Sequence, residues 1–376
     1  MNRALQLLTT CLLSLSLFTQ SLTACINTTY SRADEVEITD DLLPLILGAF
    51  PHHGWAFYEH EIVRTLKVLS ENPNDFHARN DLGAAYTKHQ LWIMAQSEFD
   101  KNEKLHPGRY ETASNLGVMY KKKGDYKQAE KYINQALEIK PGGHMGLGDY
   151  YLRMIQWLGN ANQLDILEKN FLGVRYDAGP KASAKAANQD HIVTLIKNDY
   201  QFPDAYVVLG DILFTRGDHQ LALRAYLRAR SLIPSDLRQS FYSSVVENRI
   251  DQIRQIWTDN KTSEHVLEPD IGEIQIYEEF EAARIWLDKF QAVEMELIKQ
   301  NKATPFHTVL AEMDTQDIHP PVVLEAGFYK GRAKEPYSAY NDPFSIIASI
   351  VILLTLLAVV IVSLWAAFRY FARRLA

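Results

Sequence analysis

Histidine and carboxylate side chains cluster between residues 51 and 61, and they are the first candidates for chemistry. His52, His53 and His60 lie beside Glu59 and Glu61, and imidazole and carboxylate groups are common zinc ligands. Adjacent histidines point in different directions, however, and no two histidines here have the four-residue spacing of one helix face. We interpret the cluster as the capping turn of the first helix, with metal binding as the alternative.

A glycine-rich run at residues 142–148 is the second candidate, because such a run can hold phosphate on its backbone N–H groups. No strand pattern precedes it and no Lys-Ser or Lys-Thr follows, so the known phosphate-loop contexts fail. The run is interpreted as a turn between helices. No nucleophile elbow, H-E-x-x-H motif or P-loop occurs, so we predict no catalytic residue, no metal site, no cofactor and no enzymatic activity.

A pattern of leucine, small, aromatic or aliphatic, and proline residues occurs twice, and the two copies are 34 residues apart. The paired positions are Leu82 and Leu116, Gly83 and Gly117, Tyr86 and Tyr120, Ala95 and Ala129, Phe99 and Ile133, and Pro107 and Pro141. A third copy contains Leu209, Gly210, Leu213, Ala222, Tyr226, Ala229 and Pro234. A fixed period of this size indicates a stack of helical hairpins.

Each residue type in the pattern has a physical role. The glycine and alanine positions let two helices approach closely, and each proline ends the second helix. The sequence therefore predicts three clear repeats, at residues 76–109, 110–143 and 203–236. Helix turns are expected near residues 89–92, 123–126 and 216–219.

The repeat resembles the tetratricopeptide repeat (TPR). The resemblance implies an all-α fold, a right-handed solenoid of helical hairpins over residues 51–300 that binds polypeptides on its concave face. The groove positions it implies are His77, Asn80, Ala84, Thr87, Lys88, Glu111, Ser114, Asn115, Val118, Lys121, Asp204, Val207, Asp211 and Phe214. Lys88, Lys121 and Lys122 form a basic end that could bind a carboxylate. The full carboxylate clamp of peptide-terminus-binding TPR proteins is not present.

Segments outside the clear repeats carry weaker patterns. Residues 147–158 read as a decayed first helix with a partner at 164–171, residues 177–189 as a loop or frayed helix start, and residues 191–197 as a helix. Apolar residues at helical spacing over 237–300 predict capping helices, which shield the end of a solenoid. Prolines between 301 and 343 predict an extended stalk with a short helical piece around 307–313.

The N-terminus has the features of an export signal. Arg3 precedes a short apolar run, and residues 1–24 are predicted to be the signal peptide. The sequence Leu-Thr-Ala-Cys that ends at Cys25 resembles the lipobox of bacterial lipoproteins, which implies a lipid on Cys25; ordinary cleavage nearby is the alternative. Residues 25–50 are predicted to be a polar tether.

The C-terminus carries a predicted transmembrane helix. Residues 344–368 contain no charged side chain, and as a helix they are long enough to cross a bilayer. Arg369, Arg373 and Arg374 follow directly. The positive-inside rule then places residues 369–376 in the cytoplasm and the solenoid in the periplasm of a bacterium, anchored to the inner membrane. The net charge of −7 and the absence of long basic runs argue against a nucleic-acid partner.

These patterns favour a membrane-anchored scaffold that binds a protein or peptide partner of the cell envelope. An envelope enzyme with its site in the divergent segments is the first alternative, and a pocket with clustered titratable residues near His52 or His144 would favour it. The second alternative is an outer-membrane lipoprotein assembly factor, against which the C-terminal span argues.

Overall fold

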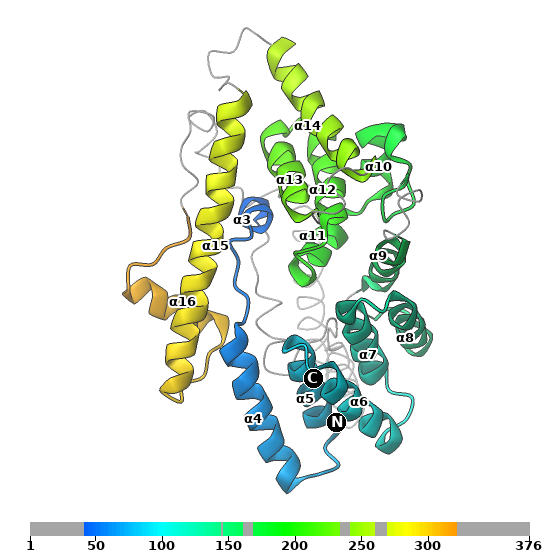
Figure 1. The fold of residues 1–376 in the computed structure, drawn as a ribbon, viewed down its shortest axis with the longest axis vertical. Coiled ribbons are helices and arrows are strands. Elements are labelled where there is room, and N and C mark those ends of the chain that lie inside the picture. Colours follow the sequence, from blue (N-terminus) through cyan, green and yellow to red (C-terminus); the bar gives the residue numbers. More distant parts are fainter. Residues whose placement is uncertain (1–40, 144–145, 161–167, 234–240, 260–268, 322–376) are drawn as a thin grey trace, which may run out of the picture. The chain divides into compact units, whose positions relative to one another are not determined.

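The computed structural model describes residues 41–143, 146–160, 168–233, 241–259 and 269–321. All its regular secondary structure in those ranges is helical, apart from one isolated bridge between Lys169 and Arg175 (Figure 1). The helices are α3 (Leu42–Leu47), α4 (Trp55–Glu71), α5 (Phe76–Lys88), α6 (Trp92–Leu105), α7 (Tyr110–Lys123), α8 (Tyr126–Ile139), α9 (Gly148–Asn160), η3 (Tyr176–Ala178), α10 (Gly179–Ala186), α11 (Gln189–Asn198), α12 (Pro203–Thr215), α13 (His219–Leu232), α14 (Phe241–Asp259), α15 (Pro269–Lys299) and α16 (Phe306–Thr315).

The three clear repeats form the helix pairs α5–α6, α7–α8 and α12–α13, and each predicted turn is confirmed. In the second and third turns, Gly124 and Gly217 adopt a left-handed backbone with φ of 83°. The first copy has no glycine there, and Gln90 takes the same left-handed region with φ of 58°. That conformation is uncommon for a residue with a side chain, so the turn geometry holds even where the sequence does not favour it.

Close packing inside each pair depends on the glycine of the first helix. A Cβ atom built on Gly83, Gly117 or Gly210 would lie 2.4–2.5 Å from the side chain opposite, which is Phe99, Ile133 or Tyr226. All three opposing side chains are fully buried. The repeat pattern therefore describes a real steric fit, in which a large side chain of one helix lies against the bare backbone of the other.

The divergent segments agree with the sequence only in part. Helices α9 and α11 confirm the helices expected around 147–158 and 191–197. The helix expected at 164–171 is wrong over 168–171, which form turns and the Lys169–Arg175 bridge; residues 161–167 lie outside the described ranges. Of the two alternatives for residues 177–189, a loop or a helix start, the structure has a helix, because α10 spans residues 179–186, packs against α12 and buries Ser183.

The end of the predicted tether is a buried helix. Residues 41–50 contain α3, which is capped by Asp41 and packs against α11, α13 and α15. Leu45, Ile46 and Phe50 are fully buried. The tether prediction is therefore wrong over 42–50, because apolar side chains there complete the core between helices that are far apart in the sequence; residues 1–40, with the predicted signal peptide and Cys25, lie outside the described ranges.

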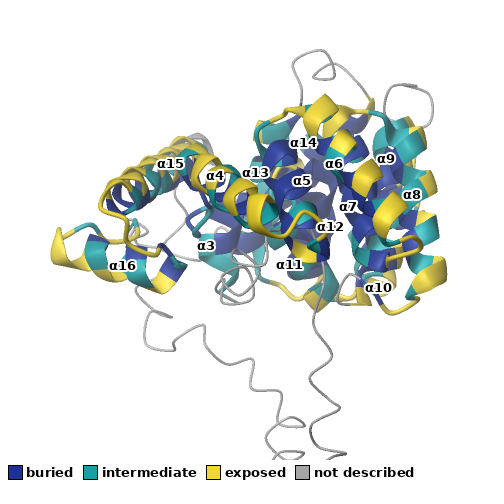
Figure 2. Ribbon diagram, turned by 90° about the horizontal axis from the view of Figure 1, so that it is seen from below, coloured by how far each residue is buried: buried dark blue, intermediate teal, exposed yellow. Residues whose placement is uncertain are grey.

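Helices α14 and α15 occupy the predicted capping region, and α14 packs on α13 (Figure 1). Figure 2 shows α5, α7 and α12 mostly buried, whereas α4 and α15 expose one side. Of the apolar residues at helical spacing along α15, Ile285 is 43% exposed. The others are buried: Ile276, Phe280, Trp286, Phe290, Val293 and Leu297. The predicted stalk is wrong at its start, because α16 packs on α15 through buried Phe306, Val309 and Met313; its helical piece is confirmed.

No helix among the described residues has the length and apolar character needed to cross a bilayer. The longest of them, α15, carries acidic and basic residues along its length. The predicted span at 344–368 and the tail at 369–376 lie outside the described ranges, as do residues 322–343 of the stalk.

We predict that Gly117→Ala destabilises the protein by about 1–3 kcal/mol, because its methyl group must displace Ile133 or separate the helices of the pair. Gly142→Ala is the matched control, since a Cβ at Gly142 has no neighbour within 4 Å. Urea denaturation of the full-length protein measures both. Equal midpoints for the two variants would contradict the role given to Gly117.

Candidate functional site

Two groove candidates on α12, Asp204 and Asp211, are buried and bind other parts of this chain. Asp204 and Asp211 lie on one helix face, as their spacing predicts, but they are 0% and 1% exposed. Tyr176 donates its hydroxyl hydrogen bond to Asp204 at 2.6 Å, and the backbone N–H of Phe171 donates to the same carboxylate at 2.6 Å. The α12 face is therefore covered by the chain itself and offers no groove.

Asp211 is also held by partners within the protein. Tyr226 donates to its Oδ1 at 2.8 Å, and Arg249 of α14 forms a buried ion pair with the same oxygen at 2.9 Å. Burying a carboxylate costs free energy unless charged or hydrogen-bonding partners compensate, and here both kinds are present. Asp211 therefore fixes α14 on the third repeat and is not available to a partner.

The remaining groove candidates divide into two groups, one buried within the protein and one that is exposed or half-buried. Thr112 donates to Asn80 at 3.3 Å, which joins α5 to α7, and Thr87 donates to the carbonyl of Gly83 at 2.9 Å. Asn115 is also buried, as are the groove positions Ala84, Ser114, Val118 and Val207. These residues hold the repeats together. His77 and Lys122 are exposed, whereas Lys88, Glu111, Lys121 and Phe214 are half-buried.

A cavity of about 210 Å³ lies at the basic end of the first two repeats. It is built from the segment between α3 and α4, the carboxyl ends of α5, α7 and α11, and the amino ends of α4 and α16. Its described lining consists of His52, His53, Gly54, Trp55, Tyr58, Lys88, His89, Lys122, Lys197, Asn198, Asp199, Tyr200, Gln201 and Phe306. We call it the basic cavity.

Three lysines give the basic cavity its charge. Lys88, Lys122 and Lys197 each lie in the last turn of a helix. A helix carboxyl end carries about half a negative charge, so three such ends offset roughly half of the charge of three lysines. Asp199 is also in the lining, but it forms an ion pair with Lys121. The described lining thus holds three lysines and one carboxylate, a composition that suits an anionic group.

Two of the three histidines in the described lining of the cavity, His52 and His89, have a buried nitrogen without a hydrogen bond. His52 stacks on Tyr200 with ring centroids 4.2 Å apart. Burial, followed by the positive charge of Lys88 and weaker effects of His53, Lys122 and Arg228, lowers the pKa of His52 to about 3. The Nε2 atoms of both His52 and His89 are buried and have no hydrogen-bond partner in the described residues.

His53 contacts a carboxylate of α15 and has a structural role. Its Nδ1 lies 2.5 Å from Oε1 of Glu294, and the other oxygen of that carboxylate accepts from the N–H of Gly54 at 2.8 Å. Glu294 is fully buried on α15, so this contact joins the start of α4 to α15. His60 is exposed on α4. Within the described ranges, no three histidine, cysteine or carboxylate side chains are arranged to hold a metal ion.

The sequence pointed to part of this cavity and missed the rest. Lys88 and Lys122, expected at one basic end, do line it, and Lys121 pairs with Asp199 beside it. Trp55, His89, Lys197 and Tyr200 were not predicted. They belong to three segments, the start of α4, the end of α5 and the end of α11, and only the tertiary fold brings these segments together, so no local signal could have identified them.

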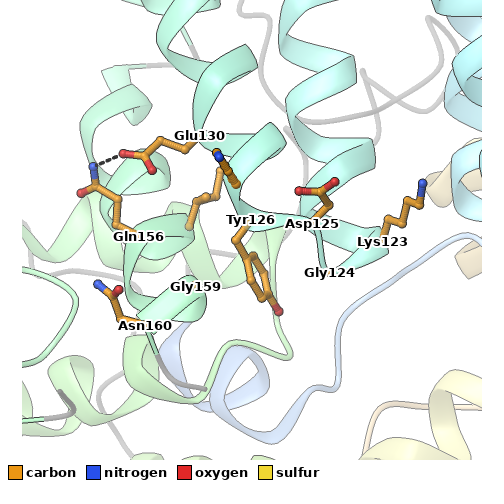
Figure 3. A pocket seen from close by; sticks show the side chains of 10 residues that line it. Lys123, Gly124, Asp125, Tyr126, Glu130, Gln156, Gly159 and Asn160 are labelled. Carbon is orange, nitrogen blue, oxygen red and sulfur yellow. Dashed lines mark hydrogen bonds between the residues drawn. The ribbon is translucent and has the colours of Figure 1, made fainter. Parts of the chain in front are cut away.

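A second hollow, of about 830 Å³, lies between the α7–α8 turn and the end of α9 (Figure 3). Its polar groups are already engaged: Asp125 accepts from the N–H of Gln128 at 3.1 Å, and Gln156 donates to Glu130 at 2.7 Å. Asn160 borders residues 161–167, which lie outside the described ranges. The hollow therefore supports no site.

We predict that Asp204 makes stability depend on pH. Burial raises the pKa of Asp204 from 3.8 to about 7, although hydrogen bonds from Tyr176 and Phe171 act against the rise. The folded protein thus binds one more proton than the unfolded chain between these values. The stabilising contribution is present below pH 4 and is lost as pH rises through 7.

Asp204→Asn removes this titration. The free energy of unfolding of the wild type, minus that of the variant, should fall by roughly 2–4 kcal/mol between pH 4.5 and 7.5, since one pKa unit corresponds to about 1.4 kcal/mol. The exposed Asp100→Asn is the control. Urea unfolding across this pH range measures the difference, and a constant difference would show that Asp204 keeps its ordinary pKa.

Comparison with known families agrees with the hairpin geometry. A tetratricopeptide repeat model matches residues 110–142, which hold α7 and α8. Another tetratricopeptide repeat model matches residues 189–236, which include α11, α12 and α13. No curated protein matches the chain. The two matched segments are similar to tetratricopeptide repeats, and the α5–α6 pair has the same glycine-centred contact.

Proposed function

We propose that this protein is a membrane-anchored scaffold that binds a polypeptide partner on the periplasmic side of a bacterial inner membrane. The observation that carries the binding role is the pair of TPR matches on helix pairs with the glycine contacts described above. Stacked repeats of this type expose extended surfaces on which other chains bind.

The basic cavity is the part of this surface that best fits a binding role. The α12 face is filled by Tyr176 and Arg249, so the concave site expected there is closed. The cavity, in contrast, combines three lysines with the aromatic residues Trp55, Tyr58, Tyr200 and Phe306. Trp55 is 60% exposed and meets the His89 ring edge-on at 4.6 Å. Exposed aromatic residues next to charged groups are typical anchors of protein interfaces.

The anchoring part of the proposal rests on the sequence. Residues 1–24 have the pattern of an export signal, Cys25 follows a lipobox-like sequence, and the uncharged span at 344–368 precedes three arginines. Together they support a periplasmic solenoid with a cytoplasmic tail at 369–376. Lipidation of Cys25 stays a prediction.

An envelope enzyme is the second candidate, and the basic cavity gives it one supporting observation. The short contact between His53 and Glu294 resembles the base-and-orienting-carboxylate arrangement that activates a nucleophile. Against it, no serine, threonine or cysteine occurs among the described residues that line the cavity. The low pKa of His52 also makes that imidazole a weak base at neutral pH. The binding role therefore fits better.

We predict that a photo-crosslinking amino acid at position 55 captures a protein partner in living cells. Trp55 lies at the cavity and is exposed, so a partner in the cavity would lie within reach of it. The matched control is the same amino acid at Phe241, which is 51% exposed on α14 and outside the cavity lining. A discrete cross-linked band at position 55 and none at position 241 is expected. Absence of a band at position 55 would contradict binding at this place.

We also predict that deletion of residues 344–376 moves the exported protein from the membrane fraction to the soluble periplasmic fraction, if residues 344–368 are the main anchor. A reporter that is active only in the cytoplasm should work when fused after Ala376. Activity of a periplasm-only reporter at that position would refute the orientation. Retention of the truncated protein in the membrane would instead favour an N-terminal lipid as the main anchor.

A further inference from the structure

We propose that the basic cavity binds the side-chain carboxylate of a glutamate or aspartate, presented by a polypeptide that also covers Trp55 with an apolar residue. This inference rests on the proposed binding function and names the chemistry of the partner. Much of the cavity wall comes from outside the three clear repeats, namely from the α3–α4 segment, the end of α11 and the start of α16.

The charge of the cavity selects an anion. Lys88, Lys122 and Lys197 all belong to its lining, and the one carboxylate in the described lining, Asp199, forms an ion pair with Lys121. The depressed pKa of His52 reflects the same positive surroundings in addition to burial. The ammonium groups of the lining lysines can donate charge-assisted hydrogen bonds to a carboxylate oxygen. Charge-assisted hydrogen bonds of this kind are about twice as strong as neutral ones.

The size and walls of the cavity favour an acidic side chain over inorganic phosphate. A volume of about 210 Å³ corresponds to several water molecules, at roughly 30 Å³ each, which suits one amino-acid side chain. Tyr58, Tyr200 and Phe306 provide apolar wall for methylene groups, with Lys88 only 5.4 Å above the Tyr58 ring. Phosphate has no group that would use these rings.

The exposed surroundings favour a polypeptide over a free organic acid. Trp55 exposes 60% of its surface, and soon after His89 the chain continues with three exposed apolar residues, Leu91 (42%), Ile93 (86%) and Met94 (47%). Several exposed apolar side chains near a charged pocket indicate an interaction surface. A small acid would fill the pocket and leave these side chains in water, whereas a peptide can cover them.

Two immobilised libraries of nine-residue peptides test the inference, one with glutamate fixed at the centre and one with glutamine. Retention of the purified full-length protein is measured on each. The Glu library should bind on the order of tenfold more tightly, a ratio that corresponds to about 1.4 kcal/mol. Lys122→Gln with Lys197→Gln should abolish this preference while leaving the protein folded, as monitored by circular dichroism.

The matched control combines Lys104→Gln with Lys185→Gln, two exposed lysines that also end helices but lie outside the cavity lining. This variant should keep the preference for glutamate. Equal retention on both libraries, or a preference that survives Lys122→Gln with Lys197→Gln, would overturn the inference and leave polypeptide binding intact. Retention on neither library would also overturn it, and cross-linking at position 55 would then decide separately about the proposed function. Displacement of the Glu library by millimolar phosphate would assign the cavity to a small anion instead.

Discussion

The fold depends on the contact between a bare helix backbone and a large side chain. At Gly83, Gly117 and Gly210 the first helix of a pair lets Phe99, Ile133 or Tyr226 reach its backbone, and no room is left for a methyl group. These contacts fix the separation of the two helices and therefore the orientation of the residues at their ends. Lys88 and Lys122 reach the basic cavity because each follows such a glycine by five residues, or about 1.4 turns, on the same helix.

Buried contacts of two glutamates on α15 are the second constraint. Arg224 of α13 forms a two-pronged pair with Glu279 at 2.7 Å, and Glu294 holds His53 and Gly54 at the start of α4. Breaking a buried pair by removing one partner costs several kcal/mol, because the other charge remains in a medium of low polarity. Helix α15 thus connects the third repeat to the N-terminal helices through acidic groups about four turns apart.

The sequence predicted the repeated helix pairs, but it could not predict contacts that occur only once in the fold. A period of 34 residues located two helix pairs and their turns, and the same residue pattern located the third pair, since the same steric fit recurs at each copy. It could not show that Asp204 and Asp211 would be covered, because Tyr176 and Arg249 belong to segments without the repeat. Residues 42–50 were assigned to a tether on account of the acidic residues before them. Their leucines and Phe50 form core only because α11, α13 and α15 meet there.

The lining of the basic cavity extends from His52 to Phe306, so more than two hundred and fifty residues of chain must fold before the cavity exists. An occupant can then bind only the native protein, and binding to the native state alone raises the free energy of unfolding in proportion to the logarithm of ligand concentration. A partner in this cavity would therefore protect the protein from unfolding and from proteases that cleave unfolded chains. The amount of this protein in the cell would follow the supply of its partner.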